Sequence, residues 1–159
     1  MEVRKIHHRD STELYALIEA SRADLKNLVW SRAATLESTI AFINAKLSKL
    51  STSQVYVILD EGKIAGCLEI WHLGDHDQLG YWLGTAFRGK RLMQQALRFI
   101  LHARRVRGEE RPLTVRIRTG NLKSQGIVRG AGFEETGRDG EWISLEWRSS
   151  TPSPAFSLT

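Results

Sequence analysis

The chain has 159 residues, of which 42% are hydrophobic and 26% are charged, and its formal net charge is +5. This length suits a single domain, and no apolar run approaches the roughly 20 residues that a membrane-spanning helix needs. We therefore expect a soluble protein with one site and no membrane partner. The positive charge favours an anionic ligand, which can be a nucleic acid, an acidic protein or a phosphorylated cofactor.

The number of cysteines and the N-terminal sequence indicate the cellular compartment of the protein. Cys67 is the single cysteine, so no disulfide can form within the chain. The segment MEVRKIHHRD is polar and lacks the apolar stretch of a secretory signal. Both features predict a cytoplasmic protein. Cys67 stands among Ala65, Leu68 and Ile70, a setting that predicts a buried and unreactive thiol.

The first third of the chain predicts one strand and two helices. Val3 to Ile6 can form a short strand, and Asp10 and Glu13 have the spacing of a capping box for the helix that follows. Residues 21–34 lead to a second helix and carry an isolated aromatic residue, Trp30. That helix is predicted by apolar residues at alternating steps of four and three: Leu36, Ile40, Ile43, Leu47 and Leu50.

A block of three strands is predicted next. Gln54–Leu59 and Lys63–Trp71 are rich in β-branched and aliphatic residues, and Asp60-Glu61-Gly62 between them is typical of a hairpin turn. Leu79–Leu83 is the third apolar run. The short connections favour an antiparallel meander.

The C-terminal half alternates between helices and strands. Lys90–Val106 has helical periodicity, Leu113–Ile117 alternates as a strand does, Asn121 can cap a further helix, and Trp142–Trp147 is a last strand. The predicted fold is α/β (α+β), in the order βααβββαβαβ, with a mixed, mostly antiparallel sheet and helices on both faces. We expect one domain over residues 1–148 and a disordered tail over residues 149–159, where two prolines and several Ser/Thr residues have little to pack against.

The connection from Leu79–Leu83 into the helix of Lys90–Val106 holds the strongest functional signal. A strand there passes through a short basic loop directly into a long helix, whose first N–H groups lack partners and lie at the positive end of the helix dipole. Arg88, Lys90 and Arg91 add full positive charges. The loop is therefore a candidate cradle for a diphosphate, although a solvated basic turn would have the same sequence.

Seven segments together resemble the Rim-type enzymes of the GNAT superfamily, which acetylate the N-terminal amine of ribosomal proteins or other amines. They are Leu28–Trp30, Gly62–Gly66, Leu79–Leu83, Arg88–Met93, Gln95–Leu97, Asn121–Ser124 and Ala131–Phe133. The resemblance implies the GNAT fold and transfer of an acetyl group from acetyl-CoA to a primary amine. The superfamily's cofactor loop usually reads Gln/Arg-x-x-Gly-x-Gly/Ala; Arg88 and Met93 match its ends, but Arg91 stands where the interior glycine is expected.

The resemblance also implies which residues contact the co-substrate. The backbone of the strand end would pair with the pantetheine arm, and the N–H groups of the loop would hold the diphosphate. Asn121 would contact the pantetheine, and the Ser124 hydroxyl would protonate the leaving thiolate. The implied cofactor-binding residues are Trp82, Leu83, Arg88, Gly89, Lys90, Arg91, Leu92, Met93, Asn121 and Ser124.

A general base must accept the proton of the attacking amine. Glu69 lies in the predicted strand Lys63–Trp71, where partial burial would raise its pKa, and it is the first candidate. Glu141, at the start of the last strand, is a second, and His72 or His76 could serve as base or, with nearby aspartates, as metal ligands. A polar turn is the simpler interpretation of the two histidines, and the resemblance calls for no metal.

Three other functions stay open from the sequence. The acceptor can be a small amine, such as an antibiotic, a polyamine or an amino acid derivative, in place of a protein N-terminus. A non-catalytic module that binds acetyl-CoA or nucleic acid is a further alternative, but no recognition motif accompanies the arginines, so nucleic acid is not expected as a partner. The arginines concerned are Arg98, Arg104, Arg105, Arg107 and Arg111. We expect a monomer or a homodimer.

Overall fold

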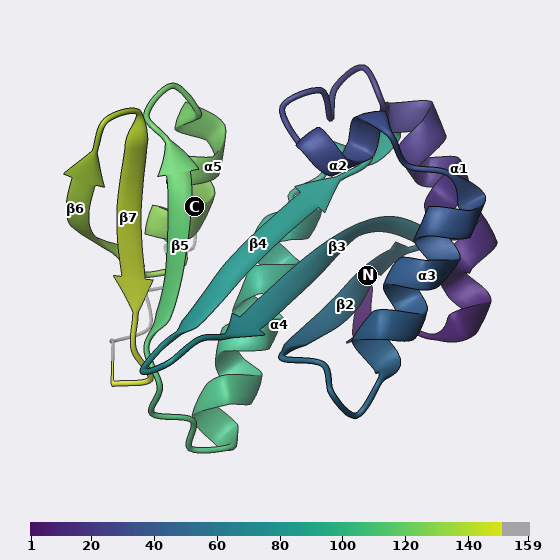
Figure 1. The fold of residues 1–159 in the computed structure, drawn as a ribbon. Coiled ribbons are helices and arrows are strands. Elements are labelled where there is room, and N and C mark those ends of the chain that lie inside the picture. The colour runs from purple at the N-terminus through teal and green to yellow at the C-terminus, as the bar shows by residue number, and fades with distance from the viewer. Residues whose placement is uncertain (151–159) are drawn as a thin grey trace. The chain divides into compact units, whose positions relative to one another are not determined.

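The computed structural model describes residues 1–150 (Figure 1). Its first three strands form an antiparallel part of the sheet. They are β1 (Glu2–Lys5), β2 (Ser53–Asp60) and β3 (Lys63–His72). Strand β2 pairs with both of the others. Glu61 and Gly62, with φ of 48° and 79°, form the tight turn between β2 and β3, which confirms the predicted hairpin.

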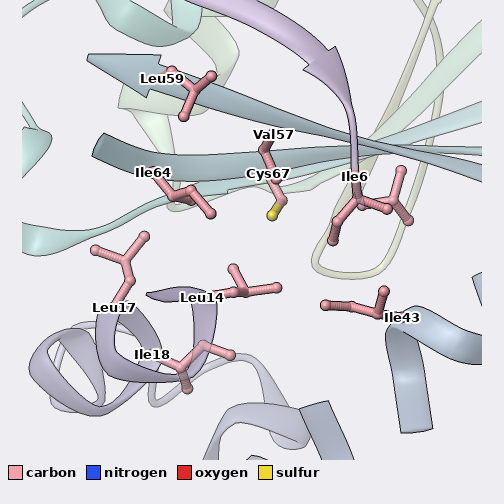
Figure 2. Packing of buried hydrophobic residues seen from close by; sticks show 10 residues of the cluster. Ile6, Leu14, Leu17, Ile18, Ile43, Val57, Leu59, Ile64 and Cys67 are labelled. Atoms are coloured by element: carbon pink, nitrogen blue, oxygen red, sulfur yellow. The ribbon is translucent and has the colours of Figure 1, made fainter. Parts of the chain in front are cut away.

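Helices α1 (Ser11–Ser21) and α3 (Leu36–Leu47) pack against these strands, and a short helix, α2 (Val29–Arg32), lies between them in the sequence. Figure 2 shows how apolar side chains from both helices and the strands meet in one cluster. The predicted apolar face of α3 is only partly confirmed. Ile43 is 1% exposed and belongs to the cluster, whereas Leu50 lies beyond the end of the helix and is 90% exposed.

The capping box predicted for α1 is wrong. The Asp10 carboxylate accepts hydrogen bonds from both terminal nitrogens of Arg4, each at 2.8 Å, and from the backbone N–H of His7. The bond from His7 caps a single turn of 3-10 helix, η1 (His8–Asp10), that precedes α1. The Glu13 carboxylate accepts the N–H of Ile64 at 2.6 Å instead. Arg4 from β1 therefore takes the buried carboxylate that a local pattern assigned to the helix.

The remaining elements follow in a βαβαββ order. They are β4 (Asp77–Leu83), the 3-10 turn η2 (Thr85–Phe87), α4 (Leu92–Val106), β5 (Leu113–Arg118), α5 (Leu122–Gly130), β6 (Glu134–Asp139) and β7 (Trp142–Trp147). The hydrogen-bonded strand order is β1-β2-β3-β4-β5-β7-β6. The β4–β5 pair is parallel and β5–β7 and β6–β7 are antiparallel, which confirms the predicted mixed, mostly antiparallel sheet.

Strand β6 is an addition to the predicted order. Its sequence, EETGRD, has no apolar alternation, and all six residues are exposed. Its backbone pairs with β7 across a register shift between Glu135 and Gly137. The strand thus depends on main-chain hydrogen bonds, which the side-chain pattern does not reveal.

The contacts divide the chain into two units. The first contains residues 1–71 and 80–92, and the second contains residues 72–79 and those from 93 on. Most of the tail predicted over 149–159 lies outside the described residues. Among residues 1–150, no helix has both the length and the apolar character that crossing a membrane requires.

Candidate functional site

The end of β4 passes closely over α1 and β3 in the first unit. Gly84 donates its N–H to the carbonyl oxygen of Ala65 at 2.8 Å. A Cβ atom at Gly84 would lie 2.3 Å from a methyl group of Leu17, so glycine allows this close approach. The chain then makes the η2 turn and enters the basic loop, which we define as Arg88–Arg91.

Two left-handed residues shape the basic loop. Gly89 has φ of 80° and Arg91 has φ of 58°. The backbone N–H groups of Gly89, Lys90 and Arg91 donate no hydrogen bond to any other of residues 1–150. Successive free N–H groups in left-handed and extended conformations, next to a helix N-terminus, form a concave anion-binding arrangement. Helix α4 begins at Leu92, directly after these three N–H groups.

Side chains from distant segments hold the η2 turn. The Ser21 hydroxyl accepts the N–H of Thr85 at 3.0 Å, and Ser21 itself is buried. The Thr85 hydroxyl donates to the Asp24 carboxylate at 2.6 Å, and an Arg88 nitrogen lies 3.9 Å from the same carboxylate oxygen. The basic loop that follows this turn is held in the same way, because Lys90 Nζ donates to Asp60 Oδ2 at 3.0 Å.

The backbone of Trp82 is closely packed on one side. A Cβ atom at Gly66 would lie 2.2 Å from the carbonyl oxygen of Trp82, so glycine lets β3 lie against the end of β4. The Trp82 ring contacts the ring of Trp30 from α2, with 5.7 Å between centroids and a tilt of 55°. Trp30 is 47% exposed, so this aromatic pair offers an apolar surface beside the strand end.

Asn121 and Ser124 lie in the second unit, at the start of α5. The Asn121 side-chain oxygen accepts the N–H of Ser124 at 3.1 Å, which confirms Asn121 as the helix cap. The neighbouring Gln125 donates its amide to the carbonyl oxygens of Arg118 and Thr119. These bonds attach the first turn of α5 to the C-terminal end of β5.

Glu141 flanks the same end of β5. Its carbonyl oxygen accepts the N–H of Thr119 at 2.8 Å, and its carboxylate accepts a 2.8 Å hydrogen bond from Arg118. The Glu141 side chain is 78% exposed. It is thus a solvent-accessible carboxylate in the same part of the second unit as Ser124.

Glu69 belongs to the first unit and is held on two sides. Its carboxylate forms an ion pair with Lys46 Nζ at 2.6 Å and accepts a hydrogen bond from the Ser53 hydroxyl at 2.8 Å. Lys46 also donates to Ser53, which closes a three-membered network between α3, β2 and β3. The side chain is largely buried, as expected, but the network gives it a structural role.

The predicted unreactive thiol is consistent with the surroundings of Cys67. The side chain is buried in the apolar cluster of Figure 2. Burial raises the pKa of the Cys67 thiol well above its ordinary value, and the charge of Glu69 raises it further. The thiolate that nucleophilic chemistry needs is therefore disfavoured.

His72 and His76 take part in polar turns of the second unit. His72 Nδ1 lies 3.0 Å from an Asp77 carboxylate oxygen, and His76 Nδ1 lies 2.8 Å from Asp75. Within residues 1–150, no group of three or more His, Cys, Asp and Glu side chains is arranged to hold a metal ion.

The predicted basic face is not a continuous cationic surface. Arg104 is 2% exposed and forms ion pairs with Asp77 and Glu109, both at 2.9 Å. Arg107 also pairs with Glu109, and Arg111 pairs with Asp77. Three of the five arginines are therefore neutralised by carboxylates, which removes much of the charge that a nucleic-acid surface would need.

Comparison with known proteins assigns the family. Residues 1–134 match the model of the acetyltransferase (GNAT) domain family. The chain belongs to this family. The fold agrees with this assignment, since solved structures of GNAT proteins superpose on most of the chain.

Two solved structures and one curated relative are similar to this GNAT protein. The ribosomal-protein-serine acetyltransferase of Escherichia coli (strain K12) is 23% identical over 78% of this chain and 79% of its own. RimL, a ribosomal-protein acetyltransferase solved with coenzyme A, has a TM-score of 0.83 at 21% identity over 92% of each chain. The microcin self-immunity acetyltransferase MccE, solved with acetyl-CoA and AMP, has a TM-score of 0.77 at 19% identity over 92% of each chain.

The residues that the sequence predicted for this GNAT protein fall into separate groups. Trp82, Leu83 and the residues from Arg88 to Leu92 belong to the first unit, whereas Met93, Asn121 and Ser124 belong to the second. Sequence reasoning missed the residues that hold the loop and its preceding turn: Ser21, Asp24, Asp60 and Thr85. No local pattern marks them, because their partners are 30 to 64 positions away in the sequence.

Proposed function

We propose that this GNAT protein transfers an acetyl group from acetyl-CoA to a primary amine. The observation that carries the proposal is the basic loop, whose three free N–H groups suit a diphosphate and which follows β4 in a chain of an acetyltransferase family. RimL and MccE were solved with coenzyme A and acetyl-CoA, respectively. We extend that co-substrate to this chain.

The loop residues would bind and orient the co-substrate, which supplies the acetyl group as a reactive thioester. Backbone N–H groups of the basic loop and of Leu92 and Met93 would hold the diphosphate, with Arg88 adding charge. The backbone of Trp82 and Leu83 would pair with the pantetheine arm. Gly66 of β3 packs closely against this backbone and so holds it in place. Holding the thioester near the amine lowers the entropic part of the barrier, because the two groups then react as if they were one molecule.

Two side-chain roles complete the proposed mechanism. Asn121 caps α5 and so fixes Ser124, whose hydroxyl would donate a proton to the departing thiolate. A carboxylate would take the proton from the attacking amine. Glu69 and Glu141 are the candidates, and we favour Glu141, because it is accessible while Lys46 and Ser53 occupy Glu69.

Paired substitutions separate the two candidate bases. Loss of a general base typically lowers the rate by about 100-fold or more. We expect Glu141→Gln to cause such a loss in kcat, with acetyl-CoA affinity retained. Glu69→Gln is expected to act on stability through its network. A 100-fold loss of kcat in Glu69→Gln alone would reverse the assignment.

The acceptor class has two candidates. A protein N-terminal amine is suggested by the ribosomal-protein-serine acetyltransferase and by RimL. A small-molecule amine is suggested by the likeness to MccE and by the half-exposed Trp30 beside Trp82, which could pack against a planar acceptor group. A ribosomal-protein acceptor would place the enzyme in the cytoplasm. We further propose one catalytic domain over residues 1–148 that acts as a monomer or homodimer.

Ligand-dependent unfolding tests the co-substrate. A ligand present at 100 times its Kd stabilises the folded state by about 2.7 kcal/mol. We expect acetyl-CoA and CoA to raise the unfolding temperature, and ATP at the same concentration to raise it much less. Equal shifts with all three ligands would indicate general anion binding, and no shift at millimolar acetyl-CoA would contradict the proposal.

A further inference from the structure

The three cations of the basic loop differ in their partners. Lys90 is bound to Asp60 at 3.0 Å, and its Nζ lies 5.5 Å from the centroid of the Phe87 ring. Arg88 lies beside Asp24 at 3.9 Å. Arg91 is exposed and forms no ion pair or side-chain hydrogen bond with any other of residues 1–150. Its guanidinium is thus the loop cation that the described protein leaves uncommitted.

Arg91 has a left-handed backbone conformation, in which an arginine is unusual. At φ of 58° a residue with a Cβ atom carries a conformational cost that glycine avoids. An arginine here is therefore not favoured by the loop conformation itself. Unlike glycine, it supplies a planar group with five N–H donors, which matches the oxygens of a phosphate in a two-pronged contact.

We propose that the Arg91 guanidinium is a phosphate ligand for CoA, in addition to the N–H groups of the loop. Asp24 and Asp60 are positioning residues in this arrangement, because they hold Arg88 and Lys90 at the two flanks of the loop. The inference rests on the proposed function, since it assigns a second phosphate contact to the same site. It concerns the phosphates of CoA as a class, which comprise the diphosphate and the 3′-phosphate.

The test compares substitutions that remove one positive charge each. Arg91→Gln keeps a flexible polar side chain at this position but is shorter and loses the charge. Its Kd for CoA, measured by calorimetry, is expected to rise about fivefold, as for loss of one exposed but well-aligned charge contact. Lys90→Gln is expected to cause a smaller loss, because Asp60 already neutralises that charge. Arg98→Gln, which removes an exposed charge of α4 outside the loop, serves as the matched control and should change Kd less than twofold.

Two further binding measurements show whether Arg91 contacts a phosphate and which one: the salt dependence of Kd, and the Kd for 3′-dephospho-CoA. The Kd of the wild-type protein should rise more steeply with salt than that of Arg91→Gln, because one fewer phosphate contact is screened in the variant. The same series with 3′-dephospho-CoA distinguishes the two sources of phosphate. If the fivefold difference persists, Arg91 contacts the diphosphate, and if it disappears, Arg91 contacts the 3′-phosphate.

Four results would overturn the inference. Unchanged CoA affinity in Arg91→Gln, or an equal loss in Arg98→Gln, would do so while leaving the proposed function intact. Tighter binding by Arg91→Gly than by the wild-type protein would mean that the side chain obstructs the site. Failure of the wild-type protein itself to bind CoA would overturn the proposed function and this inference together.

Discussion

Arg91 is the residue at which stability and binding are expected to diverge. Its left-handed backbone conformation costs free energy in the folded state, and glycine would relieve that cost. We expect Arg91→Gly to raise the free energy of unfolding by about 0.5–1 kcal/mol, measured by urea denaturation without CoA. Gly89→Ala, at φ of 80°, is the control and should lower it. A less stable Arg91→Gly protein would show that the side chain has packing contacts of its own.

At the scale of elements, Asp77 joins the start of β4 to the end of α4 and to the segment before β5. It is 2% exposed, pairs with Arg104 at 2.9 Å, and accepts hydrogen bonds from Arg111 and His72 near 3.0 Å. Burial by itself would raise the Asp77 pKa, but the hydrogen bonds from His72, Arg111 and Arg104 outweigh burial and lower it below its ordinary value.

This balance predicts how stability depends on pH. Since the folded pKa of Asp77 lies below the unfolded value of about 3.9, its contribution is complete above that pH and is lost as the pH falls through the folded pKa. We expect Asp77→Asn to cost about 3 kcal/mol at pH 7, because it weakens the pairing of the buried Arg104. The difference from wild type should shrink below about pH 4. Asp75→Asn, at an exposed neighbour, is the control, and a cost that does not vary with pH would contradict the account.

Most elements could be predicted because their signals are local. Alternation in Leu113–Ile117 and the turn at Asp60–Gly62 are each set by a few consecutive residues, and both appear as expected. Strand β6 could not be predicted, since its polar residues are ordered by backbone pairing with β7. The capping box at Asp10 failed for a similar reason: Arg4 competes for the carboxylate from a neighbouring strand.

The same distinction applies to the candidate site at the scale of the whole molecule. The basic loop was predictable because a strand, a glycine and a helix start follow each other within a short stretch of sequence. The partners that hold it were not, because Asp24 and Asp60 belong to segments far away along the chain. Glu69 was a candidate base from its strand position alone, whereas its surroundings depend on Lys46, which belongs to α3.

Amine-dependent release of CoA thiol from acetyl-CoA tests the proposed activity most directly. The purified protein would be mixed with saturating acetyl-CoA and a panel of acceptors: peptides with a free N-terminus, the same peptides with a blocked N-terminus, and small polyamines. We expect thiol release that requires a free amine, is matched by one acetyl group on the acceptor, and falls by about 100-fold in Ser124→Ala. Thiol release that is absent across the panel, or equal with blocked and free amines, would contradict the account.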